Sequence, residues 1–305
     1  MRICSFLPGA TEILYELGLG DSVVGVTHAC DFPPEASSKN IVVRSVFDST
    51  RLNSEEIDRM IAHLVRQGRD VYTIDENTLK QLDPDLIVAQ GLCEVCSPHV
   101  KELKRAMNLL NNKPEVIVLD PHDLDDILES IVVIARKVGR KQKGDEIVKA
   151  LKERIDHVRS IASNALNRPK VLCIEWLDPL FSAGHWIPQM VELAGGINGI
   201  SKRAQSSRRM EWREVEEFDP DIIVLMPCGF GIGRTMSELW RIEKVEKWKE
   251  LKAVKNKEVY ATDASPYFSR PGPRTVTGLE ILAKVIHPEL FDVFQVPADS
   301  YRKIY

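Results

Sequence analysis

Two copies of one short pattern decide the fold of this chain: LDPDLIV at residues 82–88 and FDPDIIV at residues 218–224. In each copy, an Asp-Pro-Asp turn leads into an apolar run, as expected for a strand that is buried on both faces of a parallel sheet. Each run ends close to a cysteine, Cys93 or Cys228. The duplication predicts two similar lobes, each built on its own sheet.

Short apolar runs extend this pattern through both halves of the chain, and helical stretches separate them. Such alternation is typical of βα units around a mostly parallel sheet. We therefore expect an α/β protein with two Rossmann-like lobes. The expected strands are Ile3–Leu7, Val23–Thr27, Val71–Ile74, Leu86–Gln90, Val116–Leu119, Val171–Ile174, Ile222–Met226 and Val259–Thr262.

A long segment between the two sets of strands carries no strand pattern. From Asp123 to about Ala165, apolar residues recur at helical spacing, which predicts one long backbone helix or two helices joined near Gly139–Gly144. A single helix of about 40 residues would be about 60 Å long. The expected organisation is an N-terminal α/β lobe at 1–121, a connecting helix at 122–166 and a C-terminal α/β lobe at 167–305. Because ligands favour the interfaces between domains, we expect a ligand cleft between the lobes.

Composition excludes several classes of protein. The 305 residues carry a net charge of −4, which argues against a nucleic-acid partner, because phosphate binding requires a basic surface. No window reaches the roughly 18 apolar residues that would span a bilayer. Residues 1–7 read as a core strand rather than as a secretory signal, so the expected location is the cytoplasm, without membrane insertion.

Several motifs are spread along the chain: SFLPGATE at 5–12, VGVT at 24–27, DFPP at 31–34, LCEVC at 92–96, WLDPLFSAGHW at 176–186 and the segment from Tyr267 to Leu290. With these motifs the chain resembles one known family, the helical-backbone (class III) substrate-binding proteins of iron-siderophore and cobalamin importers. The resemblance covers nearly the whole chain and is greatest to the cobalamin-binding branch and its leaderless cytoplasmic relatives. It implies two α/β lobes that together form one iron- or cobalamin-type binding domain, a rigid connecting helix and a ligand held with little hinge motion.

A set of aromatic residues falls in loops at strand ends, where an open α/β sheet binds its ligands. Aromatic faces bury much area at little entropic cost, so such a set suits a large flat ligand such as a corrin or another metal chelate. For any single aromatic residue, ordinary packing is the alternative. The predicted ligand-binding aromatics are Phe47, Trp176, Phe181, Trp186, Phe230, Tyr267 and Phe268.

Three polar residues join this predicted ligand site. His185, in a loop after a strand, is a candidate axial ligand to a corrinoid cobalt, although a hydrogen-bonded loop histidine explains it equally well. Arg270 and Arg274 lie in a proline-rich segment after the last expected strand and can bind carboxylate or phosphate groups in bidentate fashion. The glycine loop Gly229–Thr235 has GxGxG spacing, so close backbone approach to a ligand explains it better than a nucleotide fingerprint does.

Cysteines and a histidine form a second predicted site. Cys93 and Cys96 form a CxxC pair, a spacing that suits either metal ligation or dithiol chemistry. With His28, Cys30 and Cys228 they would make a soft ligand set suited to zinc or an iron–sulfur cluster. A pair of small buried side chains, or a disulfide formed in air, is the alternative. Cys4 and Cys173 lie within strands and are interpreted as core residues.

Two functions follow as hypotheses. The first is a substrate-binding protein of the ABC-importer type that holds a corrinoid or another metal chelate between its lobes. This function requires no catalysis, and the resemblance implies an ABC permease as a further partner. The alternative is a cytoplasmic metal or iron–sulfur protein, with a redox or metal-handling role, that uses the cysteine and histidine set.

Overall fold

In a computed structural model, the chain forms two compact α/β units, and residues 1–91, 107–108, 110 and 113–305 are described. The first unit comprises Met1–Pro121 and Asp126–Val148, and the second comprises His122–Asp125 and Lys149–Tyr305. This confirms the predicted α/β class with two units. Within the described ranges, no helix combines the length and the apolar character that a membrane span requires.

The first unit is built on a six-stranded sheet in the order β4-β3-β2-β1-β5-β6, in which only β4 runs antiparallel to its neighbour. Three short 3-10 turns, Gly20–Ser22, Pro34–Ser38 and Ser49–Arg51, lie in its loops. Its elements are β1 (Ile3–Ser5), α1 (Pro8–Glu16), β2 (Val23–Thr27), β3 (Asn40–Ser45), α2 (Ser54–Arg66), β4 (Tyr72–Ile74), α3 (Glu76–Leu82), β5 (Leu86–Gln90) and β6 (Glu115–Leu119).

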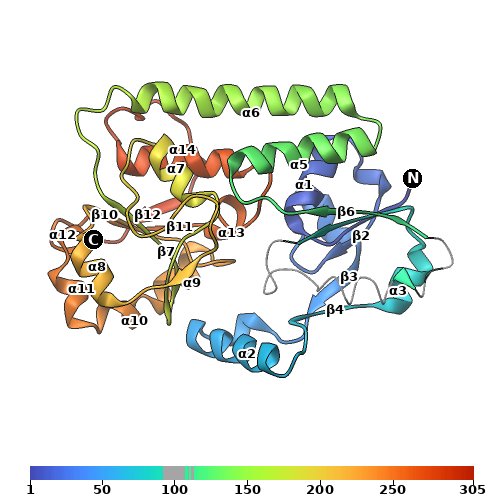
Figure 1. Ribbon diagram of the computed structural model, residues 1–305, viewed down its shortest axis with the longest axis horizontal. Helices are drawn as coiled ribbons and strands as arrows, with labels where there is room; N and C mark the ends of the chain where they lie inside the picture. The colour runs from blue at the N-terminus through green and yellow to red at the C-terminus, as the bar shows by residue number, and fades with distance from the viewer. Residues whose placement is uncertain (92–106, 109, 111–112) are drawn as a thin grey trace. The chain divides into compact units, whose positions relative to one another are not determined.

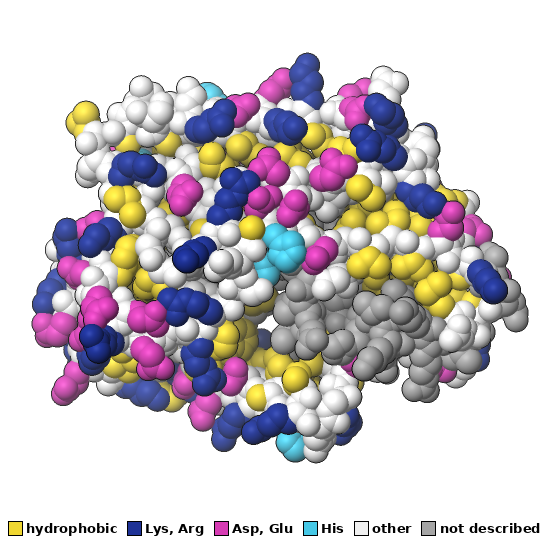
Figure 2. Space-filling model, viewed as in Figure 1, with side chains coloured by type: hydrophobic (Ala, Val, Ile, Leu, Met, Phe, Trp, Pro, Cys, Tyr) yellow, Lys and Arg dark blue, Asp and Glu magenta, His cyan; other side chains and the backbone are white. Residues whose placement is uncertain are grey.

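The segment between the sheets forms two helices, α5 (Leu124–Lys137) and α6 (Lys141–Ala162), which is the second of the two alternatives that its periodicity allows. The break falls at Gly139, whose φ of +69° is the left-handed conformation that glycine adopts most readily. A Cβ on Gly144 would lie 2.3 Å from that of Ala135, so a glycine is needed where the two helices pack side by side (Figure 1). Basic and acidic side chains alternate along α6 and pair with one another (Figure 2).

The second unit is built on a mixed six-stranded sheet in the order β12-β11-β10-β7-β8-β9. Its centre, β7, β10 and β11, is parallel, whereas β8, β9 and β12 run antiparallel. Its elements are β7 (Val171–Leu177), β8 (Leu180–Ser182), α7 (Ile187–Leu193), β9 (Arg208–Arg209), α8 (Trp212–Phe218), β10 (Ile222–Leu225), α9 (Ile232–Glu238), α10 (Trp240–Glu243), α11 (Glu246–Glu250), α12 (Lys252–Lys255), β11 (Val259–Thr262), α13 (Ala264–Tyr267), α14 (Thr275–Ile286) and β12 (Tyr301–Lys303).

The antiparallel strands correct the expectation of a mostly parallel second sheet. Hairpin strands such as β8 need only a short turn after β7, and three residues are too few to form a recognisable apolar run. In the first unit, β3 was not predicted either, because its two buried residues, Val42 and Val43, are flanked by polar residues such as Asn40 and Arg44. The predicted strands include the edge strands β4 and β6, and the strands that were not predicted are β3 and the short strands β8, β9 and β12.

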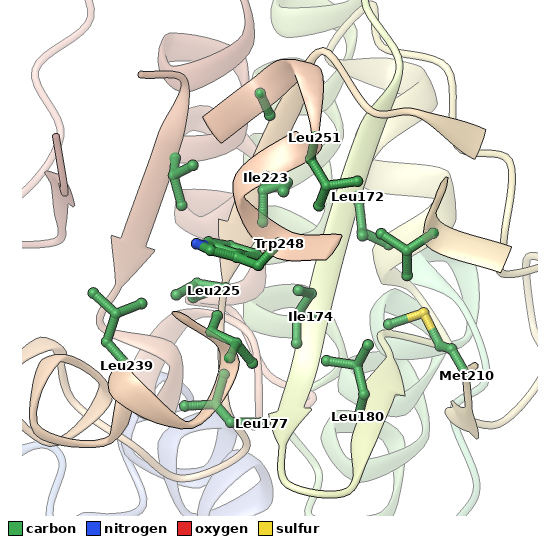
Figure 3. Packing of buried hydrophobic residues seen from close by; sticks show 14 residues of the cluster. Leu172, Ile174, Leu177, Leu180, Met210, Ile223, Leu225, Leu239, Trp248 and Leu251 are labelled. Atoms are coloured by element: carbon green, nitrogen blue, oxygen red, sulfur yellow. The ribbon is translucent and has the colours of Figure 1, made fainter. Parts of the chain in front are cut away.

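Trp248 anchors the core of the second unit. It is 1% exposed and packs with Leu172 and Ile174 of β7 and with Ile223 and Leu225 of β10 (Figure 3). Burying an aromatic side chain of this size contributes about 1.5–3 kcal/mol or more. This packing fixes β7 and β10 next to each other and thereby fixes the loops that follow them.

The duplicated Asp-Pro-Asp pattern has one structural role in both units. Asp83 and Asp219 adopt left-handed φ angles of 38° and 44°, which end α3 and α8 before β5 and β10 begin. The second aspartate, Asp85 or Asp221, accepts a hydrogen bond at 2.7 Å from the backbone N–H that precedes the neighbouring strand. The pattern therefore ends a helix and sets the register of two parallel strands.

Candidate ligand-binding site

The carboxyl ends of β7, β10 and β11 lie together in the second unit, and backbone hydrogen bonds join the loops that follow them. The N–H of Cys228 donates to the carbonyl of Glu175 at 3.0 Å, and the carbonyl of Phe230 accepts from Ala264 and Ser265. The N–H of Gly229 donates to Ser269 Oγ at 3.0 Å. We call the strand ends and loops at residues 175–182, 226–234 and 263–274 the carboxyl edge.

Aromatic side chains from two of these strand ends meet at the carboxyl edge. The rings of Trp176 and Phe230 make an edge-to-face contact with centroids 5.2 Å apart. Trp176 is paired across the β7–β8 hairpin with Phe181, whose ring centroid lies 5.9 Å from the guanidinium carbon of Arg209. Trp176 and Phe181 are partly exposed, whereas Phe230 is only 2% exposed. The edge thus offers aromatic surface to a flat ligand, with Phe230 as its support.

Two other predicted aromatics are buried. Trp186 and Phe268 are 5% and 4% exposed, and Trp186 Nε1 donates to the Phe268 carbonyl at 3.1 Å. This contact holds the start of α7 against the loop after α13. Their role in ligand binding stays a prediction, and their small exposed area indicates mainly a supporting position.

His185 lies in a strained turn that a second loop holds. Its φ of 53° is left-handed, its N–H donates to the Gln205 carbonyl at 2.6 Å, and its own carbonyl accepts from Ala204 at 3.0 Å. The imidazole lies 6.2 Å from that of His122 and 5.6 Å from the Trp186 ring, centroid to centroid. A left-handed non-glycine residue costs about 1–3 kcal/mol and is common at functional sites.

Glu175 is a residue that sequence reasoning did not single out. Its Oε2 accepts from the Ser207 hydroxyl at 2.7 Å and from the Gly184 N–H at 3.3 Å. Burial raises the pKa of this carboxyl group, although these two hydrogen bonds oppose the change. The only signal in the sequence was an acidic residue within an otherwise apolar run.

Cationic side chains also reach the carboxyl edge. Arg270 Nη2 donates to Ser265 Oγ at 3.0 Å, and Thr275 Oγ1 donates to the Arg270 carbonyl at 3.0 Å. Tyr267 and Arg274 are partly buried in the same segment. Arg234, which the sequence analysis did not select, lies over Phe230 with its guanidinium carbon 3.8 Å from the ring centroid.

In the first unit, the predicted site residues Phe47, His28 and Cys30 each contact different neighbours. Phe47 is partly buried, and its N–H donates to Ser45 Oγ at 3.3 Å. His28 is exposed, and its Nδ1 lies 3.4 Å from the Val43 carbonyl. Cys30 is 4% exposed, with its Sγ 3.1 Å from Thr11 Oγ1 and 3.3 Å from Thr27 Oγ1.

Within the described residues, the predicted metal ligands do not form a metal site. Among those residues, no group of three or more His, Cys, Asp and Glu side chains is placed to hold a metal ion. Cys30 contacts two threonine hydroxyls, and Cys228 belongs to the other unit, while Cys93 and Cys96 lie outside the described residues. The alternative of a cytoplasmic zinc or iron–sulfur protein therefore has no support here.

The sequence matches the family described as periplasmic binding protein over residues 3–266. The chain belongs to this family. It is similar to the uncharacterized ABC transporter substrate-binding lipoprotein YvrC of Bacillus subtilis, with 27% identity over 95% of this chain and 81% of the relative. It is also similar to the vitamin B12-binding protein of Vibrio cholerae, with 25% identity over 92% of this chain and 86% of the relative.

A solved structure shows the same fold. The periplasmic heme-binding protein RhuT of Roseiflexus sp. RS-1 superposes with a TM-score of 0.70 and 21% identity, covering 95% of this chain and 98% of that chain. The family match and the similarity to an ABC transporter substrate-binding lipoprotein confirm the predicted class of substrate-binding protein that serves ABC importers. The expectation of a cytoplasmic protein is wrong, because these relatives are described as a lipoprotein and as periplasmic.

Proposed function

We propose that this protein binds a corrinoid of the cobalamin type and delivers it to an ABC permease. The observation that carries the proposal is the contact of Trp176 with Phe230 at the carboxyl edge, in a chain that aligns over 92% of its length with a vitamin B12-binding protein. A corrin ring is large, flat and mostly apolar at its faces, so it gains most from partly exposed aromatic side chains.

Arg270 and Arg274 complete the proposed site by supplying charge at its rim. Both follow β11 in the segment that carries Tyr267, and Ser265 fixes the guanidinium of Arg270. Guanidinium groups suit the amide and phosphate oxygens at the periphery of a corrinoid. Phe47 of the first unit remains a predicted contact. Binding alone is required, so the proposal assigns no catalytic residue.

Calorimetric titration with cyanocobalamin tests the proposal directly. A ligand that binds only the native protein adds about 2.7 kcal/mol of stability at a concentration 100 times its Kd, so the melting temperature must rise along with the binding heat. Absence of both effects with cyanocobalamin and with dicyanocobinamide would refute corrinoid binding.

Two tryptophan variants give the matched comparison for that titration. Trp176→Ala removes the proposed contact surface and should weaken binding by at least about tenfold, since a ring contact of this kind contributes about 1.5 kcal/mol or more. Trp240→Ala is the control, because Trp240 is 53% exposed on α10 and lies outside the carboxyl edge. Equal loss in both variants would argue against Trp176 as a contact.

Heme is the second candidate ligand, and the histidine pair favours it. His185 lies 6.2 Å from His122, centroid to centroid, and imidazole is a common axial ligand of heme iron. Titration with hemin would then give a Soret band that shifts on binding and changes in His185→Ala. A shift that persists unchanged in this variant would exclude His185 as the ligand.

A further inference from the structure

Arg234 lies over the ring of Phe230 at the carboxyl edge. Its guanidinium carbon is 3.8 Å from the centroid of the Phe230 ring, and that ring contacts the edge of Trp176 at 5.2 Å. Stacking at this distance is favourable, because the face of an aromatic ring attracts a cation. The stack places a positive charge beside the aromatic surface that is proposed to meet the ligand.

A buried ion-pair network holds the guanidinium in place. Arg234 Nε lies 3.9 Å from Glu238 Oε1, and Glu238 Oε2 lies 3.3 Å from Arg241 Nε. Arg241 in turn contacts Asp178 at 2.9 Å. The side chains of Glu238 and Arg241 are 8% and 6% exposed, whereas that of Arg234 is 26% exposed. Arg234 is thus the basic member of this network with the greatest access to solvent.

Glu238 is shared between two arginines, Arg234 and Arg241. Glu238 and Asp178 both contact Arg241, so Arg234 does not hold Glu238 alone. Burial lowers the pKa of the Arg234 guanidinium, while Glu238 opposes this effect. An added anion would offset the cost of burying that charge, and charge pairs gain strength where water is partly excluded.

A second cation, Arg270, reaches the same edge from the loop after β11. The carbonyl of Phe230 accepts the N–H of Ser265, whose hydroxyl accepts from Arg270 at 3.0 Å. Arg234 lies in the first turn of α9, directly after the loop that carries Phe230, and Arg270 lies on the loop that hydrogen bonds join to Phe230. This arrangement gives the edge an aromatic face and a basic border.

We propose that Arg234 is a specificity residue of the carboxyl edge, and that it binds a carboxylate or phosphate group on a ligand whose flat face meets Trp176. This inference rests on the ligand-binding function proposed above and adds a chemical requirement to it. A planar guanidinium fixed by stacking is suited to such oxygens, since it presents paired N–H donors in one plane. The phosphodiester of a cobalamin and the propionates of a heme are the two sources of this chemistry.

The test compares ligands that differ in their anionic group. Cyanocobalamin carries a phosphodiester that dicyanocobinamide lacks, and hemin carries two carboxylates. Calorimetry would measure Kd for the wild type, Arg234→Gln, Arg234→Lys and the surface control Arg213→Gln, whose parent arginine is 83% exposed and paired with Glu217. A charged hydrogen bond is worth about 1.5–3 kcal/mol, so Arg234→Gln should weaken cyanocobalamin binding about tenfold to a hundredfold.

Each outcome has one meaning. A large loss for cyanocobalamin with less than about a threefold loss for dicyanocobinamide supports phosphate recognition, and Arg234→Lys should fall between the wild type and Arg234→Gln. If the wild type binds hemin but neither corrinoid, the corrinoid proposal fails, and about a tenfold loss of hemin binding in Arg234→Gln still supports the anion site. If Arg234→Gln binds the anionic ligand of the wild type with an unchanged Kd, the inference is overturned. Equal loss for both corrinoids also overturns it.

Discussion

The Glu175 carboxylate accepts a hydrogen bond from the Ser207 hydroxyl at 2.7 Å and thereby ties the end of β7 to the loop before β9. The same oxygen accepts the Gly184 N–H at 3.3 Å. A partly buried acid thus fastens the turn that carries His185. Because burial raises its pKa, Glu175 binds protons more tightly in the folded than in the unfolded chain.

The first prediction concerns the pH dependence of stability in Glu175→Gln. A group with a raised folded pKa adds stability below its unfolded pKa, about 4.3 for glutamate, and this contribution is lost as pH rises through the folded pKa. The glutamine side chain of the variant would keep the hydrogen-bond acceptor without the charge. The melting temperature of the variant relative to the wild type should therefore rise as pH increases from about 4 to about 8.

A second glutamate supplies the control for this measurement. Arg208 lowers the pKa of Glu214 through a side-chain hydrogen bond, so Glu214 stabilises the fold above its unfolded pKa and loses that effect in acid. Glu214→Gln should lose stability relative to the wild type as pH rises, opposite to Glu175→Gln. Parallel curves for the two variants would contradict the assigned roles.

The second prediction concerns the close approach of two loops at Gly184. A Cβ added here would lie 2.4 Å from the Ser207 nitrogen and 2.5 Å from the Gln205 carbonyl oxygen, both backbone atoms that cannot rotate away. Gly184→Ala should therefore destabilise the protein by about 1–3 kcal/mol in denaturant unfolding. It should also displace the His185 turn.

Gly233 gives the matched glycine control. It lies within α9, and an added Cβ would meet nothing within 4 Å. Alanine favours a helix over glycine by up to about 1 kcal/mol, so Gly233→Ala should leave stability unchanged or raise it. A comparable loss in both variants would mean that the clash at Gly184 is not the cause.

The duplicated Asp-Pro-Asp pattern shows why the fold could be predicted from the sequence. Asp85 and Asp221 precede strands that are buried on both faces, and a doubly buried strand appears in a sequence as an unbroken apolar run. Edge strands such as β9, with only Arg208 and Arg209, have no apolar run to detect. Their position depends on pairing with β8, which is a tertiary contact.

The candidate site was only partly predictable for a related reason. Trp176 and Phe230 were selected because both follow apolar strands, and the structure brings their rings together. Glu175 was missed because its importance depends on a neighbour distant in the sequence, Ser207. Whether a charged side chain is buried is decided by packing, which strand periodicity does not report.

The third prediction concerns Asp221, which accepts the Lys170 N–H at 2.7 Å and pairs with the Lys252 ammonium at 2.5 Å. Burial acts to raise the pKa of this carboxyl, but the two hydrogen bonds and nearby lysine charges lower it overall. Asp221→Asn should therefore cost about 1 kcal/mol at about pH 7, and the difference should shrink as pH falls below about 4. A difference that does not change between about pH 7 and about pH 3 would show that charge is not involved.

The fourth prediction concerns thiol reactivity. Burial raises the pKa of Cys4 to about 12, and it also raises that of Cys173. Because the thiolate is the reactive form, neither should be alkylated by iodoacetamide in the native protein at about pH 8, whereas the partly exposed Cys228 should be. Peptide mass spectrometry before and after denaturation measures this order. Early labelling of Cys173 would contradict the packing of β7.

The last prediction concerns Arg241, whose side chain is 6% exposed and contacts both Asp178 and Glu238. Removing one partner of a buried ion pair leaves the other charge without compensation, at a cost of about 3–5 kcal/mol. Arg241→Ala should therefore lower the free energy of unfolding by about that amount. Arg213→Ala, at an exposed pair with Glu217, should cost less than about 1 kcal/mol.

Because Glu238 also contacts Arg234, loss of Arg241 should in addition draw Glu238 toward Arg234 and weaken anion binding there. Equal stability of the two variants would show that the network around Glu238 does not hold the carboxyl edge together.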